Sequence, residues 1–203
     1  MTAGATARDL EDYGPGTALV VVDVQNDFAD PDGGLHVPGG EEVVGLVDAE
    51  VERAHAAGSL VAYTQDWHPG STPHFAKDGG TWPVHCVAGT WGAELAPGLR
   101  VVGEVVRKGT GGEDGYSGFS VRDPVSGEQA ATRLGALLHA AEVTRVVVVG
   151  LAGDHCVKET ALDARRAGYE AVVPLALTRF VELAPGDADA AVHELRDAGV
   201  EVR

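Results

Sequence analysis

The sequence has few cysteines and no long apolar run, and each shortage excludes a class of protein. Only Cys86 and Cys156 occur among 203 residues, which excludes a disulfide framework and leaves both thiols free for packing or chemistry. A reducing compartment is the simplest expectation. No stretch of about 18 apolar residues is present, so no transmembrane helix is predicted. Residues 1–16 lack the apolar core of a secretory signal, and we therefore expect a cytoplasmic protein.

Positive charge is also scarce. Lys and Arg total 15 against 31 Asp and Glu, which gives a formal net charge of −16. Because nucleic acids and anionic membranes attract basic patches, neither is expected as a partner. The acidic residues are scattered, which is typical of a solvated surface. The sequence leaves the oligomeric state open, a homo-oligomer included.

The chain is rich enough in hydrophobic residues, at 44%, to bury the core of one domain. Apolar runs typical of buried strands alternate with segments of helical spacing, and this predicts an α/β fold with a doubly wound, mostly parallel sheet and helices on both faces. The run at 145–151 is expected at the centre of the sheet. Residues 1–16 are interpreted as an N-terminal extension of a domain at 17–203. Strands are predicted at residues 17–23, 59–66, 100–107, 145–151, 170–177 and 200–203, and helices at 41–57, 132–141, 156–167 and 187–198.

Polar side chains stand at the carboxyl ends of four predicted strands. Asp23 and Asp66 end the first and second strands, Lys108 follows the third, and Cys156 follows the strand at 145–151. Ligands of open α/β sheets bind beyond this edge. Two acids, a base and a thiol are of no use to core packing there, so the pattern indicates a catalytic or binding site.

Cys156 stands at the predicted start of a helix. A helix N-terminus carries partial positive charge and unpaired N–H groups, which lower the pKa of a thiol and can bind an oxyanion. The alternative is a small buried core residue. We interpret Cys156 as a nucleophile with a lowered pKa, Asp23 as the acceptor of its proton and Lys108 as the group that stabilises the charges. Asp154 is interpreted as the N-cap of the helix rather than as a catalyst.

A metal site is predicted in the segment that follows the second strand. Asp66, His68 and His74 place one carboxylate and two imidazoles within nine residues, and His85 lies eleven residues further on. Ligands of this kind suit Zn, Fe or Mn. A single histidine is more often a surface or core residue, but the clustering favours one divalent ion per chain, with the role of His85 left open.

Taken together, these motifs resemble those of the isochorismatase-like cysteine hydrolases, and within them the nicotinamidase (pyrazinamidase) branch. The resemblance extends from about residue 18 to residue 202, and the order and spacing of the motifs also agree. The motifs that carry it are VVDVQNDF (21–28), TQDWHP (64–69) followed by His74, TWPVHCV (81–87), RKG (107–109), YSGF (116–119) and GLAGDHCV (150–157).

The resemblance implies a fold, a reaction and further site residues. It implies a six-stranded parallel sheet, hydrolysis of nicotinamide to nicotinate and ammonia through a thioester, and a triad of Asp23, Lys108 and Cys156. The metal ligands would be Asp66, His68 and His74, with His85 near or on the metal in some members. Phe28 and Trp82 would enclose the pyridine ring. The Leu151–Ala152 bond would be cis, and the N–H groups of Ala152 and Cys156 would form the oxyanion hole. Gly153 departs from the usual Thr of the family, which predicts a looser loop before the nucleophile.

Two other functions are kept as alternatives. A sister hydrolase would act on another small amide, a ureido compound or isochorismate, but such branches commonly lack the loop with Asp66, His68 and His74. A metal-binding, redox-sensing module would use Cys156 as a reactive thiol, but it would leave Asp23 and Lys108 without a role. Release of ammonia from nicotinamide distinguishes the three.

Overall fold

The computed structural model describes residues 12–203. The predicted N-terminal extension at residues 1–16 therefore lies mostly outside the described residues. Of its last residues, Tyr13 donates its hydroxyl to Glu50 at 2.7 Å, and Gly14 and Ser59 exchange two hydrogen bonds. No helix within residues 12–203 is long and apolar enough to cross a bilayer.

The centre of the fold is a parallel sheet whose strands follow the order β3-β2-β1-β6-β7-β9, with β8 paired to β6. The predicted central place of residues 145–151 is confirmed, because β6 lies between β1 and β7. The expected six strands become seven through the two-residue β8, which pairs with Gly150 and Leu151. The strands are β1 (Thr17–Val22), β2 (Leu60–Asp66), β3 (Glu104–Lys108), β6 (Arg145–Leu151), β7 (Glu170–Val173), β8 (Thr178–Arg179) and β9 (Glu201–Val202).

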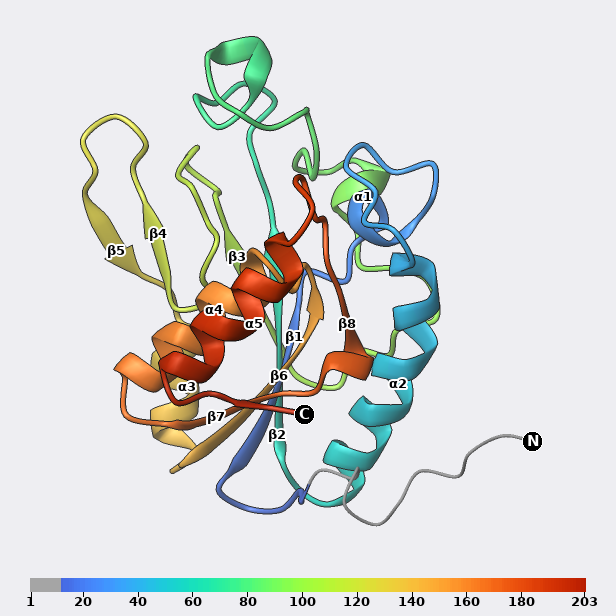
Figure 1. Cartoon of the computed structure of the whole chain (residues 1–203), viewed down its shortest axis with the longest axis vertical. Helices are drawn as coiled ribbons and strands as arrows, with labels where there is room; N and C mark the ends of the chain where they lie inside the picture. Colours follow the sequence, from blue (N-terminus) through green and yellow to red (C-terminus); the bar gives the residue numbers. More distant parts are fainter. Residues whose placement is uncertain (1–11) are drawn as a thin grey trace.

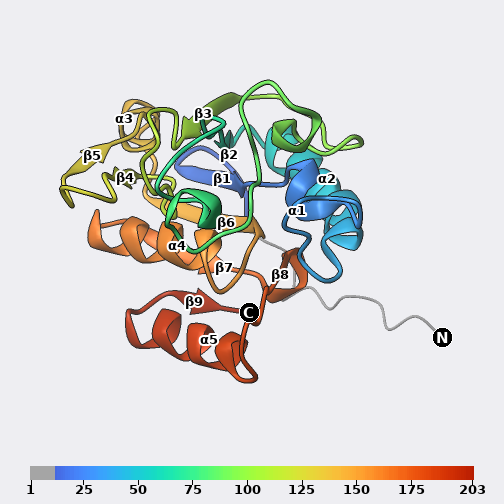
Figure 2. The same ribbon diagram turned by 90° about the horizontal axis from the view of Figure 1, so that it is seen from above.

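Helices cover both faces of this sheet, as predicted (Figures 1 and 2). Helix α2 packs on one face with the stripe that contains Val43, Val47 and Val51. Helices α3, α4 and α5 pack on the other face through residues such as Leu134 and Leu195. Because strand side chains alternate between faces, β1 contributes to both cores. The helices are α1 (Asn26–Ala29), α2 (Gly40–Ala56), α3 (Leu134–Ala140), α4 (Cys156–Arg166) and α5 (Asp187–Asp197), with short 3-10 turns η1 (Ala76–Asp78), η2 (Trp91–Ala93) and η3 (Leu175–Leu177).

Two predicted strands are shorter than expected. The strand predicted at 100–107 begins only at Glu104, because side chains bind the backbone of Arg100: its N–H donates to Asp48 and its carbonyl accepts from Tyr63. The strand predicted at 170–177 ends at Val173, since Pro174 has no N–H to continue the ladder. The strand at 145–151 occurs with the predicted bounds, and the remaining predicted elements differ from theirs by at most two residues at either end.

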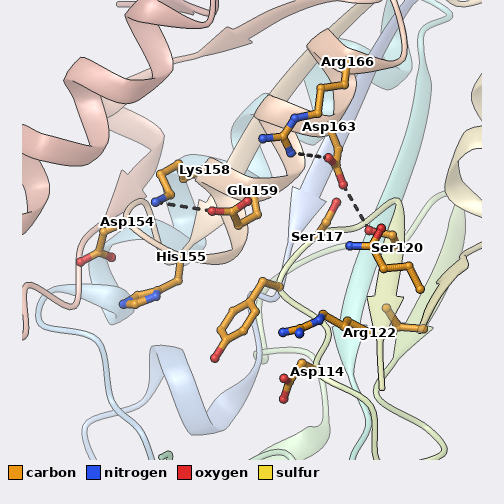
Figure 3. A pocket seen from close by; sticks show the side chains of 13 residues that line it. Asp114, Ser117, Ser120, Arg122, Asp154, His155, Lys158, Glu159, Asp163 and Arg166 are labelled. Carbon is orange, nitrogen blue, oxygen red and sulfur yellow. Dashed lines mark hydrogen bonds and ion pairs between the residues drawn. The ribbon is translucent and has the colours of Figure 1, made fainter. Parts of the chain in front are cut away.

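An antiparallel hairpin was not predicted. Its strands, β4 (Ser120–Arg122) and β5 (Gln129–Ala131), form a separate two-stranded sheet after the YSGF motif. Three-residue strands are too short to show an alternating pattern. The hairpin lies beside α4, and together they border a groove next to the candidate site (Figure 3).

Candidate active site

The topology brings the four polar strand ends together. Strands β3, β2, β1 and β6 are consecutive neighbours, and all run parallel. Asp66 and Lys108 are the last residues of β2 and β3, Asp23 directly follows β1, and Cys156 begins α4 after β6. The carboxyl ends of neighbouring parallel strands lie at the same edge of a sheet. The structure therefore confirms that the four polar residues converge at that edge.

Lys108 lies at the centre of this cluster with only 1% of its surface exposed. Its Nζ is 2.8 Å from Asp23 Oδ2, 2.6 Å from Asp66 Oδ1 and 3.8 Å from Cys156 Sγ, and it also donates to the Gly115 carbonyl. Burial acts to lower the pKa of Lys108, but Asp23 and Asp66 outweigh it and hold that pKa well above its usual value. The ammonium therefore stays charged and compensates buried negative charge.

The two carboxyl groups beside Lys108 differ in acidity. Burial raises the pKa of Asp23, which has no exposed surface. Burial also acts to raise the pKa of Asp66, but Lys108 and the neighbouring His68 outweigh it and lower that pKa. Asp66 is thus the permanent anion of the pair, and Asp23 is the carboxyl better suited to take and return a proton.

The prediction of a lowered pKa for Cys156 is wrong. Burial outweighs the adjacent Lys108 and raises the pKa of this thiol well above its ordinary value. Helix α4 does begin at Cys156, as predicted, but the side chain sits in a desolvated pocket beside the carboxyl groups of Asp23 and Asp66. A thiol that is protonated at neutral pH needs a neighbouring base to take its proton before it can act as a nucleophile. A carboxylate oxygen of Asp23 lies within 4.8 Å of the sulfur.

Gln25 fixes the position of Asp66, a role that the sequence did not reveal. Its side-chain amide donates to the Asp66 carbonyl at 2.8 Å and accepts from the Asp66 N–H at 2.8 Å. The same amide donates to the Ala93 carbonyl at 2.9 Å. This side chain thus joins the end of β2 to the loop that follows the histidines. The signal in the sequence was a single amide two residues after the strand-end Asp23 within VVDVQNDF, and it did not indicate which group the amide would bind.

Three histidines form a buried cluster beside Asp66. Ring nitrogens of His68, His74 and His85 lie within 4.8 Å of one another, and Asp66 Oδ2 is 3.8 Å from His68 Nε2. Neither ring nitrogen of His68 has a hydrogen-bond partner among the described residues. The sequence left His85 open, and the structure places it in the cluster with His68 and His74. Asp114, which was not predicted, binds His74 Nδ1 at 2.7 Å.

The electrostatics of this cluster suit a cation. Burial lowers the pKa of His74, and it lowers the pKa of His85 to about 4, so both imidazoles are neutral near pH 7. Neutral imidazole is the form that coordinates metals, and His74 also has the second contact, from Asp114, that orients a metal-bound histidine. The unpartnered nitrogens of His68, two further neutral imidazoles and the Asp66 carboxylate fit a divalent ion of the zinc type.

A small, mostly apolar cavity lies between the histidines and the thiol. Phe28 and Trp82, predicted to enclose a ring, both line it, as do His74, His85 and Cys156. The indole N–H of Trp82 donates to the Tyr116 hydroxyl at 2.7 Å. Further lining residues, which sequence reasoning did not identify because they come from separate loops, are Leu35, Val37, Tyr116, His155 and Val181.

The loop before Cys156 is held more firmly than predicted. The Leu151–Ala152 bond is cis, which confirms that expectation. Gly153 donates its N–H to the Arg179 carbonyl at 2.7 Å, and a Cβ at Gly153 would lie 2.6 Å from the Phe180 ring. The glycine therefore makes room for an aromatic ring and does not loosen the loop.

Asp154 has a different role from the one predicted. His155 is the N-cap of α4, and its side chain forms no capping bond. The Asp154 carboxylate instead accepts the N–H groups of Val181 and Glu182 at 3.0 and 2.8 Å. The sequence could not reveal this contact, because its partners lie 27 and 28 residues away in the chain.

A groove of about 790 Å³ adjoins the cavity and shares Tyr116 and His155 with it. Figure 3 shows charged side chains from α4 and the hairpin along its walls. Two pairs of these charges compensate each other: Lys158 pairs with Glu159 at 3.4 Å, and Arg166 pairs with Asp163 at 2.8 Å. The walls of the groove are therefore polar and partly ion-paired, whereas the lining of the enclosed cavity is mostly apolar.

Known proteins with related sequences and folds match almost the whole chain. A nicotinamidase of Escherichia coli is 34% identical over an alignment that covers 91% of this chain and 93% of the relative. A pyrazinamidase of Pyrococcus horikoshii, solved in complex with zinc, has a TM-score of 0.82 and 34% identity, and covers 93% of this chain and 99% of its own. PnC1 from L. infantum, solved in complex with nicotinate, has a TM-score of 0.85 and 36% identity and covers 96% of each chain. The model of the isochorismatase domain matches residues 17–203. The chain therefore belongs to the isochorismatase-domain family.

Proposed function

We propose that this protein is a metal-dependent amidohydrolase that converts nicotinamide to nicotinate and ammonia. The observation that carries the proposal is the cavity itself, in which Cys156 faces a buried three-histidine cluster across a space lined by Phe28 and Trp82. A pyridine carboxamide is flat and mostly apolar, which suits the lining of this space. The related nicotinamidase and the nicotinate complex support the same substrate. Residues 17–203 would form the catalytic domain, acting in the cytoplasm.

Asp66, His68, His74 and His85 would hold one divalent ion. The histidines are buried and close together. The zinc complex of the related pyrazinamidase supports a divalent ion at this site. When bound, the ion supplies a coordination site for the pyridine nitrogen, which orients the ring relative to the thiol.

The side chains of the triad would perform the chemistry in two stages. Asp23 takes the proton of Cys156 as the sulfur attacks the carboxamide carbon, and the Lys108 ammonium compensates part of the negative charge in the site. The backbone N–H groups of Ala152 and Cys156 would donate to the oxyanion. Cys156 begins α4, and the first N–H groups of a helix have no intrahelical partner, while Ala152 belongs to the loop before it. The C–N bond then breaks, Asp23 returns the proton to the leaving ammonia, and a thioester remains.

The second stage returns the protein to its starting state. Asp23 takes a proton from a water molecule, whose oxygen attacks the thioester carbon. The C–S bond breaks, Asp23 returns its proton to the sulfur of Cys156, and the carboxylic acid leaves and gives up its own proton to water. The raised pKa of Asp23 suits both the uptake and the return of the proton.

The proposal is tested by ammonia release from nicotinamide, with benzamide as the comparison because it lacks the ring nitrogen. We expect nicotinamide to be hydrolysed well and benzamide poorly. Metal analysis should find about one ion per chain, since the described residues provide one three-histidine cluster. Chelation should raise KM for nicotinamide strongly and leave the slow benzamide rate almost unchanged. A protein that purifies without metal and treats both amides alike would instead be one of the metal-free sister hydrolases.

A further inference from the structure

Thr64 makes a contact with Asp23 that the reaction described above leaves without a role. Its hydroxyl donates to Asp23 Oδ1 at 2.6 Å, and neither residue has any exposed surface. Thr64 lies on β2, the strand adjacent to β1, and its carbonyl accepts the Asp23 N–H at 3.3 Å. Asp23 is therefore bound to Thr64 twice, through its backbone N–H and through its carboxyl group.

The two oxygens of Asp23 have different surroundings. Oδ1 is occupied by the Thr64 hydroxyl. Oδ2 meets the Lys108 ammonium as an ion pair at 2.8 Å and accepts no hydrogen bond from any residue that the structure describes. Lys108 Nζ is in turn 3.8 Å from Cys156 Sγ, so Oδ2 and the thiol share the lysine as a neighbour, and a carboxylate oxygen of Asp23 lies within 4.8 Å of the sulfur.

We infer that Thr64 is a positioning residue that occupies Oδ1 and presents Oδ2 of Asp23 to the thiol proton. This inference rests on the proposed function in that it assigns Asp23 the role of base. A carboxylate can rotate about its last bond, and Lys108 alone holds a single oxygen. The Thr64 hydroxyl on Oδ1 restricts this rotation, and as a neutral donor it adds no charge to the site.

Among the residues that the structure describes, the charged and titratable groups around Asp23 do not replace this contact. The charged and titratable groups that face it are Lys108 from β3, Asp66 from β2 and Cys156 from α4. Lys108 is also held by Asp66 and the Gly115 carbonyl, so it cannot turn toward Oδ1 without losing those bonds. Asp66 repels the carboxylate, which leaves the Thr64 hydroxyl as the neutral donor at Oδ1.

The test compares Thr64→Val, which removes the hydroxyl at nearly constant volume, with Thr64→Ser, which keeps it. In the metal-loaded protein we expect Thr64→Val to lower kcat for nicotinamide by about 10- to 100-fold, the size expected for a hydrogen bond to a charged group. KM should change less than about twofold, because Thr64 does not line the cavity. Thr64→Ser should stay within about threefold of wild type in kcat.

A second readout does not depend on nicotinamide. Alkylation of Cys156 by iodoacetamide at one fixed pH, followed by mass spectrometry, should be slowed in Thr64→Val by a similar factor and restored in Thr64→Ser. Thr160→Val is the matched control: Thr160 is equally buried, but its hydroxyl binds the Gly118 N–H at 2.9 Å and not the base. This control should lower thermal stability and leave the alkylation rate of the folded protein unchanged. If Thr64→Val does not fold, the pair Thr64→Ser and Thr64→Ala, which also differs by one hydroxyl, replaces it.

The inference is overturned if the valine variant alkylates and turns over at the wild-type rate, or if the serine variant is as slow as the valine variant. It is also overturned if the loss appears in KM with kcat unchanged. If wild type releases no ammonia from nicotinamide while the alkylation rates still separate valine from serine, the substrate assignment fails and the role of Thr64 stands.

Discussion

The reactivity that we propose for Cys156 would come from its neighbours and not from its own acidity. Burial raises the pKa of the thiol, while the helix N-terminus and Lys108 act in the opposite direction. The place of Cys156 was predicted correctly, because a strand end followed by a helix start is visible in the residue pattern. The extent of desolvation was not visible, since it depends on side chains from distant loops that close the cavity.

Substitution of the two cysteines separates their roles. Cys156→Ala removes the sulfur that attacks the substrate, so kcat for nicotinamide should fall by at least about a thousandfold, or ~4 kcal/mol. Cys86→Ser should keep most of the activity, because Cys86 is a buried residue whose sulfur contacts the Gly92 carbonyl outside the cavity. Steady-state ammonia release measures both. Appreciable turnover by the alanine variant would exclude the thioester route.

At the scale of single residues, the errors share one physical cause. Asp154 was expected to cap its own helix but binds the N–H groups of Val181 and Glu182. Gly153 was expected to loosen its loop but accommodates the Phe180 ring. Local rules predict local contacts, and both partners come from a segment that returns beside the loop after helix α4 and strand β7. Such contacts depend on the fold and not on neighbouring residues.

The helices and strands were predicted better than the side-chain contacts, and the position of the candidate site depends on the strands. Each of the strands β1, β2, β3 and β6 carries its polar residue at or just beyond its carboxyl end, and a shift of a few residues at the start of β3 leaves Lys108 in place. The hairpin of β4 and β5 and the two-residue β8 were missed, because strands of two or three residues carry no periodicity. The catalytic edge was therefore predictable, whereas the walls of the cavity were not.

The segment after β8 tests how elements support the cavity. Val181 lines the cavity, and the Asp154 carboxylate holds the backbone of Val181 and Glu182. Asp154→Ala frees this segment, so KM for nicotinamide should rise by about tenfold while kcat changes less than about threefold. Asp154→Asn, which keeps one acceptor oxygen, should lie between. Initial-rate kinetics of the three proteins decide the matter, and a large fall in kcat with KM unchanged would instead indicate a catalytic Asp154.

At the scale of the whole molecule, the apolar core and the candidate site occupy different parts of the sheet. Its two faces are covered by apolar cores, one under α2 and one under α3, α4 and α5. The titratable groups that are buried together, including Asp23, Asp66 and Lys108, lie at the carboxyl edge instead. Substitutions in the face under α2, at residues that do not line the cavity, should therefore change the free energy of unfolding with little effect on the reaction.

Tyr63 gives a pH-dependent test of this separation. It is fully buried on β2 under α2, and its hydroxyl donates to the Arg100 carbonyl at 2.9 Å. Burial raises the pKa of Tyr63 above its ordinary value of 10.0. The unfolded chain releases this proton near pH 10 and the folded chain does not, so the neutral phenol stabilises the fold fully below pH 10. This contribution is lost as pH rises from 10 toward the folded pKa, at about 1.4 kcal/mol per pH unit.

Urea unfolding of wild type and Tyr63→Phe under reducing conditions measures the effect. Below pH 10 the phenylalanine variant should be less stable by about 1 kcal/mol, because the Arg100 carbonyl loses its donor. Above pH 10 the difference should shrink, since phenylalanine has no proton to lose and only wild type becomes less stable through this group. Turnover of nicotinamide near pH 7 should be similar in the two proteins, because Tyr63 does not line the cavity. A stability difference that stays constant up to pH 11 would show that the phenol ionises equally in both states, and that the core under α2 does not exclude water from it.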